Sequence, residues 1–296
     1  MRSIIIALLC SLSISLGLVA QGPVTHAIFD LGEVLVKTDK RAAFKEVGYT
    51  PFIQYALANI TRIFVLKKMI YDELLFPFLT SVEERNPNQV AARDPEGRLL
   101  PQIMCTHFKG GITDEQVRTN IDAALKALAY LNHIETTMIR ALTSMMFTPE
   151  RFIKTQYIVP EGKAFVQECV ARGLKPCIHS TWARESFELL KQQDPDFFNL
   201  FEDRIFISGH TGFMKPDPAS YTHITNTLGI PASACTFFDD RPENISVARA
   251  CGMQAHLITP AFSWLQPWKH VPDFDAACAY LTALNSPINA VPGIAL

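Results

Sequence analysis

The sequence predicts an α/β protein, in which a parallel sheet is covered by helices on both faces and carries a helical insertion. From about residue 160 onward, short apolar runs alternate with helical stretches of about 10–15 residues, which is the rhythm of a parallel sheet. Residues 40–154 are instead mostly helical in their apolar spacing. One apolar run, residues 25–29, precedes them. Residues 25–29 can be a strand of the same sheet as the later strands only if residues 40–154 are an insertion.

Composition fits a folded globular protein and gives no sign of a nucleic-acid partner. The chain has 296 residues, of which 48% are apolar and 19% charged. Its formal net charge is −2, and no basic block stands out. We therefore expect one large domain or two smaller ones, with no nucleic acid bound.

The first 20 residues resemble a secretory signal peptide. Arg2 precedes an almost wholly apolar stretch from Ile4 to Ala20, although Leu18 stands where a small residue is preferred. We expect an exported protein, periplasmic or secreted, with no stable membrane association after residues 1–20 are cleaved. The alternative is a membrane anchor, because about 17 apolar residues are the lower limit for a span.

Cysteine spacing indicates buried thiols and no cysteine-based zinc site. Of seven cysteines, Cys10 would leave with the signal peptide, and the remaining six show no C-x-x-C pair. Cys177 and Cys235 lie in apolar runs and are expected in the core. An exported protein could still pair some of the others.

Within the insertion, two stretches have helical periodicity and a polar loop separates them. Apolar residues recur from Ile63 to Leu74 and again from Val117 to Leu128. Residues 83–101 between them are polar and contain three prolines, which is typical of a surface loop.

After the insertion, glycine and proline mark where the helices begin and end. Gly173 ends the first helix, Gly229 and Pro231 end the third, and Pro242 starts the fourth. The C-terminal extension, residues 261–296, follows the last strand. The expected helices are 161–172, 183–192, 219–228, 242–251 and, within the extension, 274–284; the expected strands are 174–179, 204–208, 235–238 and 254–258.

Polar side chains follow four of the predicted strands, and in a parallel sheet those strand ends share one edge. A hydroxyl, helix N-terminal amides and an ammonium there would bind phosphate. Three carboxylates so close would repel each other unless a cation held them, and oxygen ligands suit Mg²⁺. One carboxylate could then attack phosphorus. The polar residues that follow the four strands are Asp30, Ser180 with Thr181, Lys215, and Asp239 with Asp240.

In order and spacing, four segments resemble the four motifs of the haloacid dehalogenase-like (HAD) hydrolase superfamily. They are residues 28–35 (IFDLGEVL), 178–181 (IHST), 215–218 (KPDP) and 237–244 (FFDDRPEN). The resemblance implies a Rossmann-like core built from residues 24–39 and 155–260. It also implies that residues 40–154 form a C1-type helical cap, as in subfamily I.

The resemblance implies a role for each matching residue at the phosphate. Asp30 would be the nucleophile and form an aspartyl-phosphate. Ser180 would bind the transferring phosphoryl group with Thr181 beside it, and Lys215 would neutralise both the phosphate and Asp30.

The same resemblance implies a metal site. Asp30, the carbonyl of Gly32, Asp239 and Asp240 would hold Mg²⁺, and Asn244 would support the metal loop. The implied activity is a Mg²⁺-dependent phosphatase that acts on a small phosphomonoester.

Gly32 departs from the family pattern and leaves three hypotheses open. Family phosphatases usually carry a second Asp two residues after the nucleophile, as a general acid–base group worth about 10²–10⁴-fold in rate. Without it the protein could be a slow phosphatase, with Asp39 or a cap residue substituting. It could be a 2-haloacid dehalogenase, although that chemistry needs no metal and the pair Asp239–Asp240 argues against it. It could also be a degenerate member that binds metal and phosphate without turnover.

Three other features favour ordinary structural roles. His179 and Trp182 are expected to pack in or near the core rather than to act on substrate. Residues 107–111 (HFKGG) favour a solvated glycine turn, with a substrate loop carrying Lys109 as the alternative.

Overall fold

The computed structural model describes residues 23–83, 92–94, 97–261 and 271–284. The predicted signal peptide, residues 1–20, lies outside the described residues, as does most of the predicted extension after residue 261. In the described part of the chain, no helix combines the length and apolar character needed to cross a membrane.

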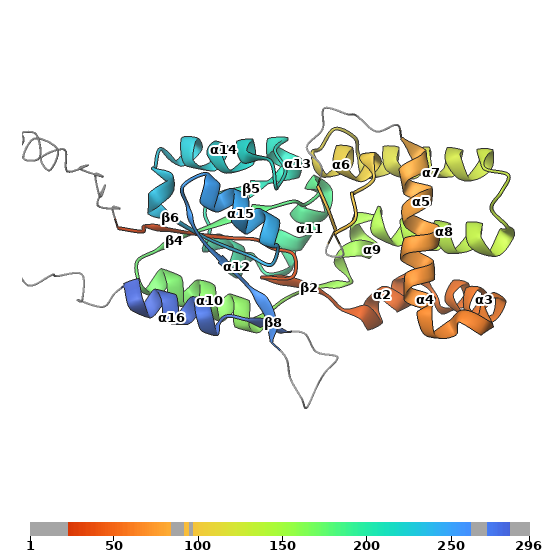
Figure 1. Cartoon of the computed structure of the whole chain (residues 1–296), viewed down its shortest axis with the longest axis horizontal. Coiled ribbons are helices and arrows are strands. Elements are labelled where there is room, and N and C mark those ends of the chain that lie inside the picture. Colours follow the sequence, from red (N-terminus) through yellow and green to blue (C-terminus); the bar gives the residue numbers. More distant parts are fainter. Residues whose placement is uncertain (1–22, 84–91, 95–96, 262–270, 285–296) are drawn as a thin grey trace, which may run out of the picture.

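The core is a five-stranded sheet in which every neighbouring pair of strands is parallel (Figure 1). This confirms the α/β prediction. β1, the first strand in the chain, lies at the centre of the sheet between two strands that follow the insertion. The order across the sheet is β5 (Ile205–Ile207), β4 (Lys175–Ser180), β1 (His26–Phe29), β6 (Cys235–Asp239) and β7 (Gln254–Leu257).

Helices cover both faces of the sheet because side chains along each buried strand alternate between two apolar clusters. Phe29 packs with α10 (Pro160–Ala171), α11 (Arg184–Gln193), α12 (Pro195–Asn199) and α16 (Asp275–Leu284). Ile28 faces the opposite cluster, which includes residues of α14 (Pro218–Leu228) and α15 (Pro242–Ala250) together with the buried cysteines Cys177 and Cys235.

The predicted strands and helices of the core lie within a residue or two of the observed ones, and the structure adds short elements. The most separate is an antiparallel ribbon made by β8 (Thr259–Ala261) and β9 (Val271–Asp273). The other additions are α12, α13 (Ser208–Thr211) and the 3₁₀ turn η3 (Ala232–Ala234). Elements of three to five residues are too short to show a clear apolar period.

The chain leaves the core and returns to it along two paired strands. β2 (Val36–Thr38) and β3 (Gln156–Ile158) are antiparallel, with Lys37 opposite Tyr157. The sequence predicted neither of these two short strands, which flank the expected helical insertion, residues 40–154. The ladder fixes both ends of the insertion side by side, next to the edge where β1 ends (Figure 1).

The insertion is helical and has its own hydrophobic core. Phe78, Leu75, Ile121, Met138 and Leu142 are among its buried side chains, and none of them belongs to the two clusters that line the sheet. Its helical segments are α2 (Lys40–Val47), α3 (Tyr49–Ala58), η1 (Ile60–Val65), α4 (Leu66–Lys68), the π-helix η2 (Met69–Leu75), α5 (Phe76–Val82), α6 (Gln102–Phe108), α7 (Asp114–Ala127), α8 (His133–Met146) and α9 (Pro149–Ile153).

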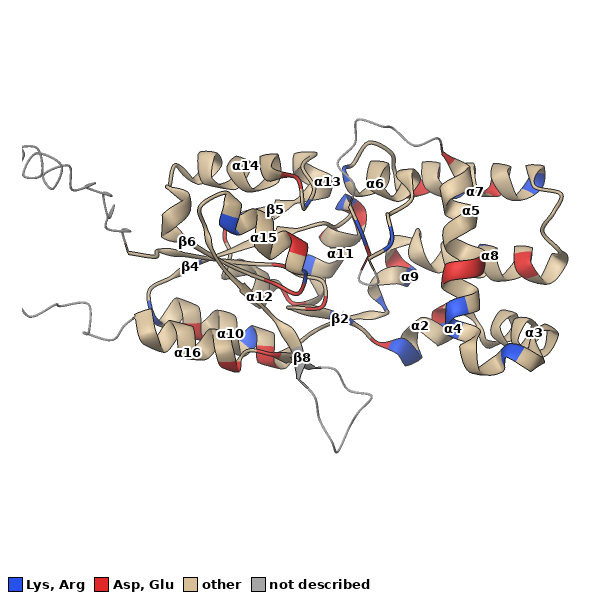
Figure 2. Cartoon of the chain, in the orientation of Figure 1, with Lys and Arg blue, Asp and Glu red and all other residues tan. Residues whose placement is uncertain are grey.

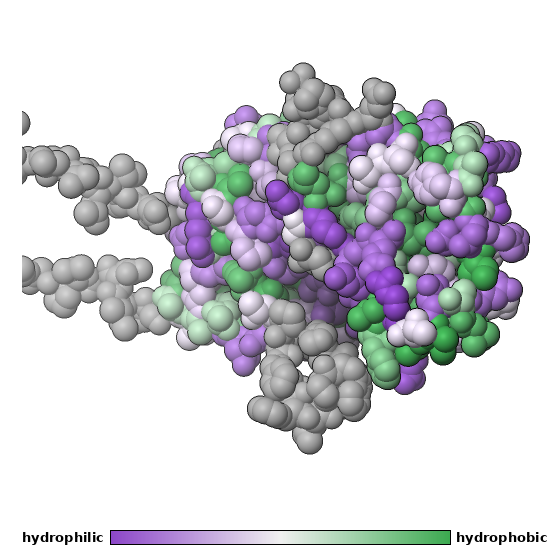
Figure 3. All heavy atoms as spheres, turned by 45° about the vertical axis from the view of Figure 1, so that its right-hand side comes forward, coloured by the Kyte–Doolittle hydropathy of each residue, from purple (hydrophilic) through white to green (hydrophobic). Residues whose placement is uncertain are grey.

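Charged residues of both signs are spread over the core and the insertion (Figure 2). Exposed apolar side chains gather instead on the insertion, where Tyr49, Ile53, Leu57 and Phe64 of α3 and η1 face solvent. Figure 3 shows this apolar surface at the lower right, with polar residues around it.

Candidate active site

The sheet brings the ends of three strands together at one edge. Phe29 of β1 is in register with Ile178 of β4 and with Phe238 of β6. Asp30, Ser180 and Asp239 therefore stand within a residue of one another at the carboxyl ends of adjacent strands, where open α/β sheets bind ligands.

Three donors converge on one oxygen of Asp30. Its Oδ1 accepts hydrogen bonds from the Leu31 amide at 2.7 Å and from the Ser180 hydroxyl at 2.7 Å. The Lys215 ammonium lies 2.9 Å from the same atom. Asp30, Ser180 and Lys215 are all buried, so these contacts fix the carboxylate away from bulk water.

Lys215 joins two carboxylates from different strand ends. Its Nζ lies 2.6 Å from Asp239 Oδ2 as well as 2.9 Å from Asp30 Oδ1. Burial alone would lower the pKa of this ammonium, but Asp239 and Asp30 outweigh it and raise the Lys215 pKa. The side chain is therefore a permanent positive charge at the sheet edge.

Asp239 is fully buried and held by its own loop. Its Oδ1 accepts from the Arg241 amide at 2.8 Å and from the Asn244 side chain at 2.9 Å. The Tyr221 hydroxyl donates to the Asn244 carbonyl at 3.1 Å. Asn244 lies where the sequence predicted support for the metal loop. Tyr221 was not predicted, because its helical spacing marks it only as a core residue.

Asp30, Asp239 and Asp240 form a compact group of three carboxylates. One oxygen from each lies within 4.8 Å of the others. Burial, followed by the charges of Asp30 and Asp239, raises the pKa of Asp240 to about 8. Burial and Asp239 also raise the pKa of Asp30, against the opposing effect of Lys215. An oxygen-only donor set with excess negative charge fits Mg²⁺.

The two remaining predicted site residues have simpler surroundings. Thr181 is half-buried after β4, and the hydroxyl that contacts Asp30 belongs to Ser180. At Gly32, an added Cβ would meet no atom within 4 Å.

Asp39, suggested as a substitute for the missing acid–base Asp, has other contacts, and His179 and Trp182 pack as the sequence predicted. Asp39 accepts hydrogen bonds from the amides of Arg41 and Ala42 and so caps α2. His179 is buried edge-on against Tyr221, and burial followed by the charge of Lys215 holds its pKa well below the usual value. His179 is therefore a neutral packing residue. Trp182 is also buried, and its Nε1 donates to Ser186 Oγ at 3.0 Å.

The insertion directly contacts Arg241, in the loop that follows β6. The Arg241 guanidinium donates to the carbonyls of Arg93 at 3.0 Å and Asp94 at 2.5 Å. Ala92 and Asp94 are buried. This corrects the prediction of a surface loop over residues 83–101 at Ala92 and Asp94, which pack against the edge of the core.

A sequence model of haloacid dehalogenase-like hydrolases matches residues 24–252, which is well over half of the chain. The chain belongs to this family. As a HAD hydrolase it also shares its fold with solved members. A HAD-like family hydrolase from Porphyromonas gingivalis has a TM-score of 0.52 at 16% identity, covering 88% of this chain and 98% of that one. A HAD family enzyme from Bacteroides thetaiotaomicron, solved with magnesium and inorganic phosphate, has a TM-score of 0.51 at 13% identity, covering 83% of this chain and 100% of that one.

Curated relatives of this HAD hydrolase include hydrolases of phosphate compounds. The chloroplast flavin mononucleotide hydrolase 1 of Arabidopsis thaliana is 31% identical over 104 residues, which are 27% of this chain and 42% of the relative. The phosphatase MT3486 of Mycobacterium tuberculosis is 25% identical over 148 residues, 47% of this chain and 65% of the relative. The chain thus spans less than two thirds of the length of either relative.

Proposed function

We propose that this HAD hydrolase is a Mg²⁺-dependent phosphatase that cleaves a small phosphomonoester through an aspartyl-phosphate at Asp30. The observation that carries the proposal is the position of Asp30, which is bonded to Ser180 and Lys215 and grouped with Asp239 and Asp240. A hydrolase and a phosphatase among the relatives, and magnesium with phosphate in a structural neighbour, support it.

The chemistry needs a nucleophile whose charge is controlled and a site that accepts phosphate. Donors fix one oxygen of Asp30. The carboxylate attacks phosphorus, an O–P bond forms, and the bond to the substrate alcohol breaks. Water then cleaves the acyl-phosphate, releases inorganic phosphate and restores Asp30. Mg²⁺ bound by Asp30, Asp239 and Asp240 would neutralise charge on the phosphate.

Ser180 and Lys215 serve both the nucleophile and the phosphoryl group. The ammonium offsets the negative charge gathered on the transferring phosphate, and the hydroxyl offers a hydrogen bond to its oxygens. Because Gly32 offers no proton, the departing alkoxide takes one from water, and we expect a slow enzyme.

The decisive experiment compares Asp30→Asn with Asp39→Asn, using hydrolysis of a generic aryl phosphate in Mg²⁺ and in EDTA. Asp30→Asn should lose at least about 10³-fold in rate, because its amide cannot form the acyl-phosphate. Asp39→Asn keeps a good helix cap for α2 and should leave the rate unchanged. Activity that survives Asp30→Asn, or that is equal in EDTA, would sink the proposal.

Gly32 also favours a second candidate, a member that binds metal and phosphate without turnover. Calorimetric binding of Mg²⁺ and phosphate, with no hydrolysis across a broad panel of phosphate esters, would support it. A dehalogenase is the weaker alternative, because Lys215 and the cluster of three carboxylates match metal-assisted phosphate chemistry. Halide release from a 2-haloacid in EDTA would revive it.

We also propose that the protein is exported. The proposal rests on residues 1–20, which lie outside the described part of the chain. N-terminal sequencing of the protein recovered from the culture medium or the periplasm tests it, with cleavage expected after Ala20. A retained segment in a membrane fraction would instead favour the anchored alternative.

A further inference from the structure

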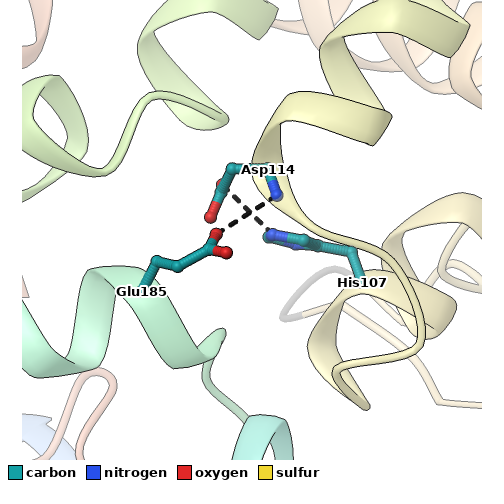
Figure 4. A group of neighbouring side chains, drawn as sticks. All are labelled: His107, Asp114 and Glu185. Carbon is teal, nitrogen blue, oxygen red and sulfur yellow. Dashed lines mark hydrogen bonds and ion pairs between the residues drawn. The ribbon is translucent and has the colours of Figure 1, made fainter.

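A second cluster of metal-ligand side chains lies away from Asp30, where the cap packs on the core. His107 is in the last turn of α6, and Asp114 is the first residue of α7; both helices belong to the cap. Glu185 lies in the first turn of α11, which covers the sheet. Figure 4 shows the three side chains pointing toward one another from these three helices.

The geometry of this cluster is tight. His107 Nε2 lies 3.1 Å from Asp114 Oδ1, and the Asp114 amide donates to Glu185 Oε2 at 3.2 Å. One ligand atom from each of the three residues lies within 4.8 Å of the other two. These distances are short enough for one ion to contact all three side chains after small rotations of the side chains.

Buried polar atoms in the cluster lack partners. His107 is 4% exposed and Asp114 is 5% exposed. Within the described residues, His107 Nδ1 and Asp114 Oδ2 are buried and have no hydrogen-bond partner. Buried polar atoms are nearly always paired, and an exception points to a missing water or ion.

The charges of the cluster also favour a cation. Asp114 and Glu185 bring two acidic side chains together, and the backbone amide of Asp114 donates to Glu185. Arg118 also acts on Asp114, but its guanidinium donates a hydrogen bond to the Phe147 carbonyl. Two carboxylates and an imidazole therefore face each other with a deficit of positive charge.

We propose that His107, Asp114 and Glu185 bind a divalent first-row transition cation, of which Zn²⁺ is the probe. One imidazole nitrogen and two carboxylate oxygens are ligands that Zn²⁺ accepts. The nitrogen ligand separates this site from the oxygen-only group at Asp30, which suits Mg²⁺. Glu185 is solvent-exposed, so an ion can enter and a water can complete the coordination.

The ion would hold the cap closed on the core. The same contact already includes a hydrogen bond from Ser208 Oγ to the Phe108 carbonyl at 2.7 Å, one residue after His107. Because two of the proposed ligands are on the cap and the third is on the core, bound metal bridges the two parts. Loss of the metal would leave this edge of the cap held by fewer contacts.

The test is a calorimetric titration of Zn²⁺ into the metal-free full chain, with excess Mg²⁺ present to occupy the Asp30 site. We expect one equivalent of Zn²⁺ to bind. Glu185→Gln should weaken its binding at least 10-fold, because it replaces a charged ligand on an exposed side chain that need not affect folding. Glu188→Gln removes the same charge from the same helix and should bind Zn²⁺ as the parent protein does.

Two further readouts do not depend on turnover. Zn²⁺ should raise the thermal midpoint of the parent protein and of Glu188→Gln but not that of Glu185→Gln. Asp30→Asn should keep the Zn²⁺ site, so failure of the proposed phosphatase would leave this inference standing. Equal Zn²⁺ binding in Glu185→Gln would overturn it, as would loss of Zn²⁺ binding in Asp240→Asn with Glu185 intact.

Discussion

Lys215 pairs with two carboxylates of the Asp30 site, so these three residues are interdependent. Lys215 lies 2.6 Å from Asp239 and 2.9 Å from Asp30, and all three side chains are buried. Removing one member of a buried ion cluster leaves its partners charged and unpaired. The resulting loss of folding free energy exceeds the net contribution of the interaction itself.

We predict that Lys215→Met destabilises the Mg²⁺-free protein by about 3–5 kcal/mol, because Asp30 and Asp239 lose the buried ammonium that pairs with both of them. Urea unfolding measures the change. The control is Lys163→Met, which removes a half-exposed lysine paired with Asp194 and should cost about 1 kcal/mol or less. Equal losses in the two variants would contradict the prediction.

Gly32 offers a direct test of the missing acid–base group. Its φ lies outside the left-handed region, and an added Cβ has open space, so a larger residue fits without strain. We predict that Gly32→Asp raises the rate of aryl phosphate hydrolysis at least about 10-fold, within the range of general acid–base catalysis.

The matched variant Gly32→Asn has nearly the same shape but cannot transfer a proton in this way. It should leave the rate at the parent level. If both variants gained rate by a similar factor, the cause would be side-chain contacts and not proton transfer, and the prediction would be wrong.

At the scale of secondary-structure elements, the cap is positioned by paired strands and by one close helix contact. β2 and β3 hold its two ends together. A second contact joins the turn after α6 to α13, which contains Gly209. A Cβ added to Gly110 would lie 2.5 Å from the Gly209 carbonyl oxygen. Such an approach is possible only with glycine at this position.

We predict that Gly110→Ala displaces the cap from α13 and raises the KM for phosphate esters. Gly110 also has φ +73, so part of any stability loss reflects backbone strain. Gly173→Ala is the control, since Gly173 has φ +82 but open space around its Cβ position. Both variants should lose roughly 1 kcal/mol to strain, and only Gly110→Ala should change KM. An unchanged KM in Gly110→Ala would contradict this role for the contact.

At the scale of the whole molecule, a partly buried histidine, His256, makes stability depend on pH. Burial, followed by the charge of Arg249, lowers the pKa of His256, whose ring stacks on Phe238. Below pH 6.5 the unfolded chain binds a proton at this ring that the folded chain resists. The unfolded state then holds more protons, so this contribution to stability is present at neutral pH and is lost as the pH falls.

We predict that parent protein loses stability relative to His256→Phe between pH 7.5 and pH 5.5. The phenyl ring keeps the stacking but does not titrate. The expected difference is no more than about 1 kcal/mol, because the histidine is only partly buried. Urea unfolding at both pH values in excess Mg²⁺ measures it. A difference that does not change with pH would refute the prediction.

Local patterns in the sequence predicted the strands of the sheet, its helices and the residues that follow each strand. Apolar alternation and helix-ending glycines are local signals that extend over a few residues, and the core elements accordingly lie within a residue or two of their predicted places. The meeting of Asp30, Ser180, Lys215 and Asp239 at one edge of the sheet followed from one topological rule about strand ends.

Which distant residues meet depends on the packing of whole elements, and only the folded structure reveals it. It placed β1 between β4 and β6, gave Lys215 two carboxylate partners, and brought Tyr221 onto the Asn244 carbonyl. It also brought His107 and Asp114 of the cap to Glu185 of the core. These contacts depend on how whole elements pack, and no local pattern in the sequence records that packing.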